Sequence, residues 1–456
     1  QAATIAVCAY SFLRIFDNRF IAFFGTVLYT LSVYRLMNMF VRGAVGEYTA
    51  MIFLPLLAYA LTLLLKKEHE KQEISKGSLL LALGMTGILQ SHILTAEIVC
   101  IMLAFLCAVY IRRVFRKEVF WAFVKAVCLT VLLNLGFLVP FADYMTTGKF
   151  NVNAINGGWR VEQNIQKCGA SFGQLAKMFY AADSKVSPQE MGGIGVNLLL
   201  SAVVFLVFWL LFKREEKRGY IWRLAVVSWT VAVMSVFMST SYFPWEALRK
   251  SNVLIRYLVI NLQFPWRFCT VASVALSILW CCLLRLVIDK WKIRAGVLTA
   301  GAVTAVGLIT AGYFAADTLR MGQSFQAVFA QGIDTMVESG EEYLPVNTDS
   351  ADFSEDNLYV GEGITVTARR RSGIRLNIDC VNQSAQDQAM EVPLLYYKGY
   401  RASGRTSDGE EIKLDVDCGN NQVVRIYVPA EFDGQISVDF KEPFYSRIAA
   451  SVSLFA

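Results

Sequence analysis

The sequence predicts an α-helical polytopic membrane bundle followed by a C-terminal, extracytoplasmic antiparallel β-sandwich domain. Three observations support this fold class. The composition is 55% hydrophobic and only 18% charged, long apolar segments follow one another, and the pattern becomes strand-like late in the chain. Because soluble domains carry about a quarter charged residues, this composition excludes an all-soluble protein. Low charge with high hydrophobicity also excludes a disordered chain.

Charge is divided unevenly along the chain. Before residue 315 there are 31 Lys and Arg residues against 15 Asp and Glu residues, a net charge of +16, whereas the remainder carries −10. We therefore predict a transmembrane domain at 1–315, a β-sandwich domain at 316–445 and the start of a further transmembrane helix at 446–456. The chain begins at Gln1 in an apolar stretch with no preceding basic segment, so we expect it to be a piece of a longer protein.

Nine apolar segments approach the 20 or so residues that a helix needs to cross a bilayer, and partial spans are expected at both ends. The nine lie near 20–33, 48–65, 78–90, 95–111, 119–139, 196–212, 220–238, 268–286 and 296–314.

Compact basic clusters are separated from one another by two predicted spans each. They are Arg14/Arg19, Lys66/Lys67/Lys71/Lys76, Arg112/Arg113/Arg116/Lys117, Lys213/Arg214/Lys217/Arg218 and Lys290/Lys292/Arg294. Short cytoplasmic loops collect Lys and Arg, so all five clusters are expected on the cytoplasmic side of the cell membrane. The loops 34–47, 140–195 and 239–266 and the β-domain then lie on the extracytoplasmic face.

Short alternating segments separated by Gly- and Asn-rich turns follow Glu342. They include Ile364–Ala368, Ile374–Ile378, Ile412–Val416, Val423–Val428 and Ile436–Phe440. This pattern is typical of a small antiparallel β-sandwich. Cys380 and Cys418 each end a strand on the oxidising side, and a disulfide between them is a hypothesis that depends on a distance between their Cα atoms.

Polar residues recur at helical spacing in the segment 34–47, at Arg35, Asn38 and Arg42. This spacing predicts an amphipathic helix lying on the external surface. Two interpretations remain open. The segment is either a connector in which Arg42 pairs with Glu47, or a site in which Arg35 and Arg42 bind a phosphate and Glu47 faces the same cavity. Arg suits phosphate because its fork presents paired donors.

His92 lies where two apolar segments meet in a hairpin. It either takes part in catalysis or substrate binding, or it only completes a turn while Ser91 or Thr95 caps the following helix. Glu97 follows one turn later among apolar residues. A carboxylate at membrane depth is a candidate site residue by default.

Other residues of the external face are candidates for substrate binding. Arg256 and Arg267 stand on the side that is usually poor in basic residues, where they either bind phosphate or extend to the interface. Pro265 fits the first turn of the following helix. Trp159, in the loop 140–195, either stacks on a sugar or anchors the interface.

Several short motifs carry a resemblance to a known family. They are Tyr34-Arg35, Arg42-Gly43 with Gly46-Glu47, Ser91-His92, Gln263-Phe-Pro-Trp-Arg267 and Glu342-Tyr-Leu-Pro345. With them the chain resembles a bacterial multi-span membrane family labelled 6-pyruvoyl-tetrahydropterin-synthase-related. It is also similar to YfhO-type proteins and, more distantly, to GT-C glycosyltransferases. The His set with which a pterin synthase would bind zinc is absent from the sequence.

The resemblance implies a GT-C-like bundle that transfers a sugar from a polyprenyl-phosphate donor to a cell-envelope glycan or lipid acceptor on the outer face. The predicted substrate-binding residues are Arg35, Arg42, Glu97, Trp159, Arg256 and Arg267, and the predicted catalytic residues are Glu47 and His92, which would act on acceptor or donor hydroxyl groups. In GT-C enzymes the catalytic acidic residue usually lies in the first external loop, which here would precede Gln1. A divalent metal is compatible with this chemistry, but no ligand spacing requires one.

Two other function classes remain open. One is a transporter or flippase of lipid-linked sugars, which should need polar residues through the depth of the bundle, where Asn134 and Glu97 are among few. The other is a non-enzymatic envelope scaffold whose β-domain binds glycans or proteins. Nucleic-acid binding is disfavoured because the basic residues are split among short links.

Overall fold

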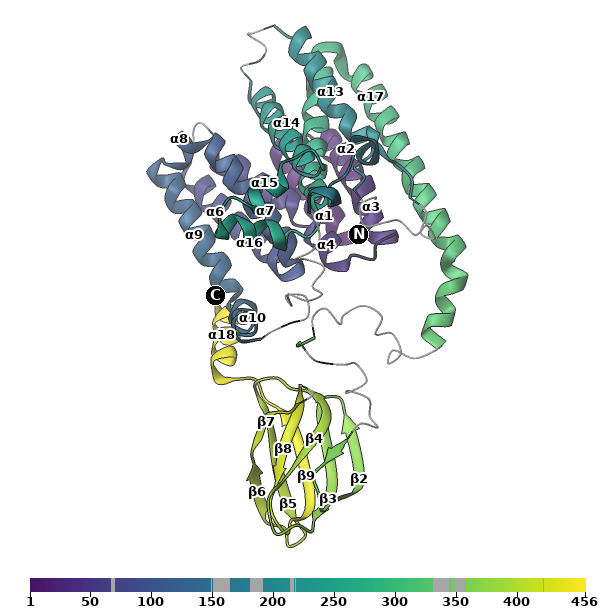
Figure 1. Cartoon of the computed structure of the whole chain (residues 1–456). Coiled ribbons are helices and arrows are strands. Elements are labelled where there is room, and N and C mark those ends of the chain that lie inside the picture. Colours follow the sequence, from purple (N-terminus) through teal and green to yellow (C-terminus); the bar gives the residue numbers. More distant parts are fainter. Residues whose placement is uncertain are drawn as a thin grey trace. The chain divides into compact units, whose positions relative to one another are not determined.

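The computed structural model is mostly helical, with a two-sheet β-domain that is followed by a C-terminal helix (Figure 1). It describes residues 1–66, 70–148, 150, 165–180, 192–213, 217, 219–330, 344–346, 348, 358–420 and 422–456, with side chains described outside 321–330. The chain forms two compact units. The first contains Gln1–Asn134 and Gln163–Thr335, and the second contains Leu135–Glu162 and Met336–Ala456.

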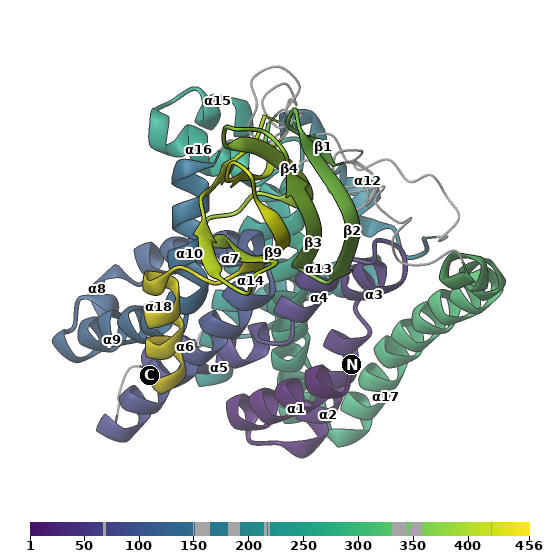
Figure 2. The same ribbon diagram turned by 90° about the horizontal axis from the view of Figure 1, so that it is seen from below.

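The first unit is built of helices. In chain order they are α1 (Ala2–Phe16), α2 (Arg19–Thr30), α3 (Val33–Phe40), α4 (Val45–Ala50), α5 (Leu54–Leu64), α6 (Lys71–Ser91), α7 (Ile93–Val109), α8 (Ile111–Val114), α9 (Lys117–Leu133), η2 (Ile165–Cys168), α12 (Phe172–Ala176), α13 (Val196–Leu211), α14 (Tyr220–Met238), α15 (Trp245–Arg249), α16 (Val253–Asn261), η5 (Pro265–Phe268) and α17 (Cys269–Ala330). Helices α1 and α2 lie side by side (Figure 2). Asn18 caps α2, because its side chain accepts a hydrogen bond from the Ile21 N–H.

Helix α17 forms the core of this unit. It packs against α2, α3, α13 and α14, and nearly all residues from Cys269 to Val287 are buried. The helix is interrupted at Trp291 and Lys292, whose backbone angles are not helical. The predicted spans 268–286 and 296–314 are therefore the two halves of α17, and the interruption falls in the predicted basic cluster at residues 290–294.

Three helices in the described part of the chain are long and apolar enough to cross a membrane: Val45–Leu64, Tyr220–Met238 and Pro265–Arg320. Two bent helix pairs, α2 with α3 and α9 with α10 (Leu135–Thr147), raise the number to five if each pair is one span. The nine-span bundle is therefore not confirmed. Helices such as α1, α7 and α13 are apolar but have at most 17 residues, which reach only about 26 Å at 1.5 Å per residue.

The segment 34–47 does not form the predicted surface helix. Helix α3 ends at Phe40, and its residues from Val33 to Asn38 are buried. Helix α3 is amphipathic, but Arg35 and Asn38 form hydrogen bonds with groups inside the protein rather than with water. Gly43 adopts a φ of +59°, which allows the chain to turn into α4. The predicted helix is therefore present only over Val33–Phe40, and its predicted position on the surface is wrong.

The β-domain consists of two antiparallel sheets. Its strands are β1 (Tyr359–Val360), β2 (Ile364–Ser372), β3 (Arg375–Asn382), β4 (Gln388–Leu395), β5 (Tyr400–Thr406), β6 (Glu411–Leu414), β7 (Val416–Cys418), β8 (Val423–Val428) and β9 (Asp433–Phe440). One sheet has the order β1-β4-β8-β7 and the other β2-β3-β9-β5-β6. Alternate side chains of both sheets, including Ile378, Val392, Ile426 and Ile436, form a core of their own. The predicted sandwich is confirmed.

The two cysteines of the β-domain lie on different sheets. Cys380 is buried on β3, whereas Cys418 is exposed on β7, and both are free thiols. The hypothesis of a disulfide between them is therefore wrong. Burial raises the pKa of the Cys380 thiol to about 11, so it stays protonated as a packing residue.

Two helices belong to the same unit as the β-domain: α10 and the C-terminal α18 (Phe444–Phe455). The Gly136 N–H of α10 donates to Ser453 Oγ of α18 at 2.7 Å. Asp143 of α10 accepts hydrogen bonds from Lys398 Nζ at 2.6 Å and from Tyr445 Oη at 2.7 Å. The helix expected at 446–456 is present, and α10 is joined to it and to the β-domain by these contacts.

Candidate functional site

A buried polar cluster lies at the N-terminal end of α4. Its central group is the carboxylate of Glu47, which is 1% exposed. Glu47 stands in the first turn of α4, where the helix N–H groups favour a negative charge. We call Tyr34, Arg42, Glu47, Arg267 and Thr270 the Glu47 cluster.

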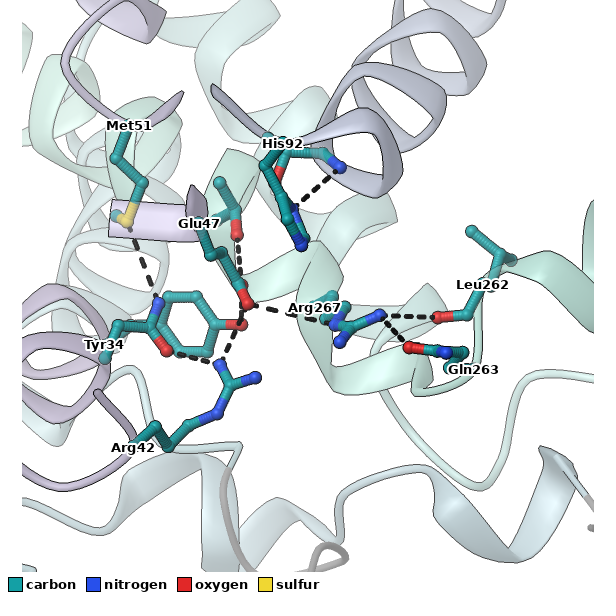
Figure 3. Close-up of polar contacts among 11 residues, drawn as sticks. Tyr34, Arg42, Glu47, Met51, His92, Leu262, Gln263 and Arg267 are labelled. Atoms are coloured by element: carbon teal, nitrogen blue, oxygen red, sulfur yellow. Dashed lines mark hydrogen bonds and ion pairs between the residues drawn. The ribbon is translucent and has the colours of Figure 1, made fainter. Parts of the chain in front are cut away.

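Four groups from separate parts of the chain meet at the Glu47 carboxylate (Figure 3). Tyr34 Oη donates to Oε1 at 2.5 Å, and Thr270 Oγ1 donates to the same oxygen at 3.1 Å. Arg42 Nη1 donates to Oε2 at 2.9 Å, and Arg267 Nε lies 3.8 Å from Oε2. These contacts join α3, the turn before α4, η5 and α17. A buried carboxylate needs such partners, since desolvation of an isolated charge is costly.

Arg42 is held by more than its ion pair. Its Nη1 also donates to Asn38 Oδ1, and its guanidinium lies 4.3 Å from the centroid of the Trp266 ring, a cation–π contact. Figure 3 shows the second terminal nitrogen of Arg42 directed away from Glu47, with no contact drawn to it. The arginine is thus fixed in position while one end of its fork faces away from its carboxylate.

Arg267 is oriented by the segment that precedes it. Its Nη1 donates to Gln263 Oε1 at 2.7 Å and to the Leu262 carbonyl oxygen at 3.4 Å (Figure 3). Gln263 has a φ of +59°, and Pro265 occupies the first turn of η5, as the sequence predicts. The resulting tight bend brings the Arg267 side chain, 8% exposed as a residue, to the Glu47 carboxylate.

Trp266 packs beside both arginines. It is 1% exposed and stacks on Phe264, with ring centroids 5.1 Å apart. Its indole Nε1 is buried and has no hydrogen-bond partner among the described residues. Buried donors are almost always satisfied in folded proteins, so this orphaned N–H is a candidate contact for a bound acceptor.

His92 caps α7 with its own side chain. Its Nδ1 accepts a hydrogen bond from the Thr95 N–H at 3.2 Å and lies 2.8 Å from Thr95 Oγ1. With Nδ1 as acceptor, the proton of the neutral ring is on Nε2. The expectation that Ser91 or Thr95 caps this helix is wrong, because an imidazole nitrogen replaces the hydroxyl oxygen in that role.

The position of His92 is set by close packing against Gly46. A Cβ atom on Gly46 would lie 2.7 Å from the Ser91 carbonyl oxygen and 3.2 Å from His92 Cδ2. Burial lowers the pKa of His92 to about 4, an effect that outweighs the opposite influence of Glu47. The ring is therefore neutral at physiological pH and presents an N–H to the region of the Glu47 cluster (Figure 3).

Arg35 does not join Arg42. Its Nη1 donates to the Tyr48 carbonyl oxygen at 2.7 Å, and its Nη2 donates to Thr4 Oγ1 of α1 at 2.5 Å. The residue is 1% exposed, and its hydrogen bonds go to Tyr48 and Thr4 rather than to Asn38 or Arg42. The interpretation in which both arginines bind one phosphate is therefore wrong for Arg35. The alternative interpretation, an Arg42–Glu47 pair, is present at 2.9 Å.

The remaining predicted residues lie away from the cluster or outside the described part of the chain. Glu97 is half-buried on α7, and it is not among the hydrogen-bond or ion-pair partners that Glu47 has in the described ranges. Arg256 is exposed on α16 and has no ion pair with a described residue. Trp159 falls in the segment 151–164, outside the described residues.

Sequence reasoning missed Tyr34 and Thr270 as members of the site. Both are ordinary hydroxyl residues in apolar helices, where they read as packing residues. Thr270 is 223 positions from Glu47 in the chain, so no spacing could link them. The one available signal was the pairing of Tyr34 with Arg35 in the motif that carries the resemblance.

Within the described ranges, no group of three or more His, Cys, Asp or Glu side chains could hold a metal ion. Comparison of the chain with protein-family models, with characterised proteins and with solved structures finds no match. The resemblance to the membrane family stays a prediction from short motifs. The chemistry of the Glu47 cluster and His92 therefore carries the functional argument.

Proposed function

We propose that this protein is a polytopic membrane glycosyltransferase of the GT-C type. It would transfer a sugar from a polyprenyl-phosphate donor to a glycan or lipid acceptor of the cell envelope on the extracytoplasmic face. The observation that carries the proposal is the meeting of two arginines at one buried carboxylate, beside a neutral histidine and an indole N–H that has no partner among the described residues.

In this proposal Arg42 and Arg267 bind the donor phosphate. Guanidinium forks match phosphate oxygens, and charge-assisted bonds of this kind are about twice as strong as neutral ones. Arg42 has a terminal nitrogen directed away from Glu47 (Figure 3). Its guanidinium also lies over the ring of Trp266, whose Nε1–H has no hydrogen-bond partner among the described residues. As the sugar leaves, negative charge grows on the phosphate, and cations fixed in advance stabilise it without reorganisation.

Glu47 acts as a positioning residue in this scheme. Both of its oxygens already accept hydrogen bonds, Oε1 from Tyr34 and Thr270 and Oε2 from Arg42. A carboxylate so occupied is poorly placed to take a proton from an acceptor hydroxyl. Its contribution is to hold the two arginines at a fixed separation.

His92 binds a hydroxyl group in this scheme. Because Nδ1 accepts from Thr95, the Nε2–H is the available donor, and it suits an oxygen of the donor sugar or the acceptor. The orientation follows the predicted charge rule, with the basic clusters on the cytoplasmic side and the Glu47 cluster on the outer side. A divalent metal is compatible with the scheme but is not required by it.

Transfer of radiolabelled sugar from the polyprenyl-phosphate donor tests the proposal in membranes that contain the full-length protein. Arg42→Lys and Arg267→Lys keep the charge and lose the fork, so transfer should fall about tenfold or more. Arg256→Lys is the matched control and should be unchanged, since Arg256 is exposed on α16. Melting temperatures of all three variants would show that folding is intact.

Two outcomes would contradict the proposal. Transport of unmodified lipid-linked sugar without any transfer would favour the transporter class. Full transfer activity in both lysine variants would remove the phosphate site from the Glu47 cluster.

A further inference from the structure

A cavity whose lining does not include the Glu47 cluster lies in the first unit. Its volume is about 610 Å³, within the range of ligand sites, and its walls come from α5, α7, α14 and α17. Glu47 stands at the start of the candidate span Val45–Leu64, and Lys66, just past the end of that span, lines the cavity. Likewise His92 begins α7, and Arg113 follows its end. The two sites thus occupy opposite ends of the same helices.

Most of the residues that line this groove are apolar. They include Leu57, Leu61, Leu106, Val231 and Ile278. Along α5 the lining runs from Leu54 to Leu65, about 16 Å at 1.5 Å per residue. That length is close to half of the roughly 30 Å hydrocarbon core of a bilayer. The groove therefore has the length of one acyl chain in one leaflet.

One end of the groove is basic. Lys66, Arg113 and Arg223 line it together with Tyr110 and Tyr220. The remaining lining residues are apolar or small hydroxyl residues, so charge is confined to this end. The groove thus offers a hydrocarbon slot that terminates in cations at the depth where a headgroup would lie.

The two arginines of this end are held without a carboxylate. Arg113 Nη1 donates to the Leu65 carbonyl oxygen at 2.6 Å, and its guanidinium lies 5.1 Å from the Tyr110 ring centroid. Arg223 is exposed and also acts electrostatically on Tyr110. Among the described residues neither arginine has an ion pair, whereas Lys66 is paired with Glu73 at 2.6 Å. Two neighbouring guanidiniums with no bound acid are complementary to an anion.

We propose that this groove binds one anionic glycerophospholipid of the surrounding bilayer. An acyl chain occupies the apolar slot, and the phosphate of the headgroup lies at Arg113 and Arg223. The pairing of a leaflet-long apolar slot with cations at one end favours a lipid over a soluble anion, which would leave the slot empty. Basic pockets between membrane helices bind anionic headgroups in this manner. The site is separate from the proposed donor site and does not depend on it.

Lipid retention by the purified full-length protein tests this inference. Native mass spectrometry would compare delipidated protein with added phosphatidylglycerol and with phosphatidylcholine of the same acyl chains. We expect the wild-type protein to retain phosphatidylglycerol preferentially. The Arg113→Gln/Arg223→Gln variant should bind it about twentyfold more weakly, since each cation near an anionic headgroup contributes roughly fivefold.

A matched control and a second variant keep the test decisive. Arg112→Gln/Lys117→Gln removes two exposed cations that do not line the groove, and it should leave retention unchanged. Ala58→Phe fills the slot while keeping both arginines, and it should lower retention of both lipids. Equal retention of the two lipids by the wild-type protein, or an equal loss in the control variant, would overturn the inference. Neither result bears on sugar transfer by the Glu47 cluster.

Discussion

The two ends of the α4–α5 and α7 helices differ in how their charged side chains are paired. At one end Glu47 is buried and accepts hydrogen bonds from groups on several elements, so its contacts fix the packing of those elements. At the other end Arg113 and Arg223 sit at the mouth of an apolar groove without an acidic partner among the described residues. The first arrangement pairs a buried charge, whereas the second leaves two arginines for the anionic headgroup that we propose. We therefore expect removal of the buried charge of Glu47 to lower stability more than removal of an exposed charge at the other end.

The largest effect is expected from Glu47→Gln. The change keeps the size of the side chain but removes the charge that faces Arg42 and Arg267, and breaking a buried pair from one side costs about 3–5 kcal/mol. Thermal unfolding in detergent would measure the loss. Asp289→Asn, which removes an exposed partner of Arg285, is the control and should change the free energy of unfolding by less than about 1 kcal/mol. Equal stability of the two variants would show that Glu47 is not the centre of the packing.

Lowering the pH should reduce the stability of the protein through His92, which lies near the Glu47 cluster. The pKa of His92 is about 4 in the folded protein and 6.5 in the unfolded chain, so the unfolded chain binds more protons between these values. The free energy of unfolding should therefore fall as the pH drops from about 6.5 to 4, by at most about 3 kcal/mol, and show no further His92 effect below that. Above pH 7 His92 contributes no slope. Denaturant titrations at a series of pH values would give the free energy of unfolding of wild type and of His92→Gln. The pH dependence of this free energy should differ between the two proteins only in this window.

A smaller effect is expected from Gly46→Ala. The new Cβ would lie 2.7 Å from the Ser91 carbonyl oxygen, a backbone atom that cannot rotate away, so overpacking should cost about 1–3 kcal/mol. Gly307→Ala in α17 is the matched control, because nothing lies within 4 Å of that position. It should be neutral or slightly stabilising. If Gly46→Ala matched this control in melting temperature, the close contact between α4 and the α6–α7 turn would be absent.

The smallest effect is expected at the basic end, from Glu73→Gln. The Lys66–Glu73 pair is 2.6 Å long, but both side chains are about one-third exposed. Exposed pairs contribute about 0–1 kcal/mol and are screened by salt. Unfolding at low and high ionic strength should therefore show a difference below about 1 kcal/mol that shrinks as salt is added. A loss of unfolding free energy as large as that of Glu47→Gln would contradict the expected difference between the two ends.

Several features could be predicted from sequence because their causes are local. The strands β2, β3, β8 and β9 follow the alternating segments closely, since a period of two is a property of neighbouring residues. The predicted strand Ile412–Val416 is divided at Asp415, because β6 and β7 belong to different sheets. Which sheet a segment joins depends on long-range pairing, and the sequence pattern does not carry that information.

The site also combines contacts that could be predicted from the sequence with contacts that depend on long-range packing. Arg42 and Glu47 are five residues apart, and their pairing was one of the two interpretations that the segment allowed. Arg35 has the same residue type and nearly the same position, yet it turns toward Thr4 of α1. Arg35 lies inside α3 and donates to Thr4 and to the Tyr48 carbonyl oxygen, whereas Arg42 follows the end of α3 and reaches Glu47, and these partners are set by packing.

The sequence by itself determined the composition of the chain, its apolar helices, the division of charge near residue 315 and the β-sandwich. These follow from residue type and short periodicity, which act over a few positions. The tertiary structure alone decided that Thr270 and Arg267 reach Glu47, that His92 caps its helix, and that a groove with two arginines lies at the far end. Such contacts depend on how helices distant in the chain pack, because burial and desolvation are set by neighbours in space.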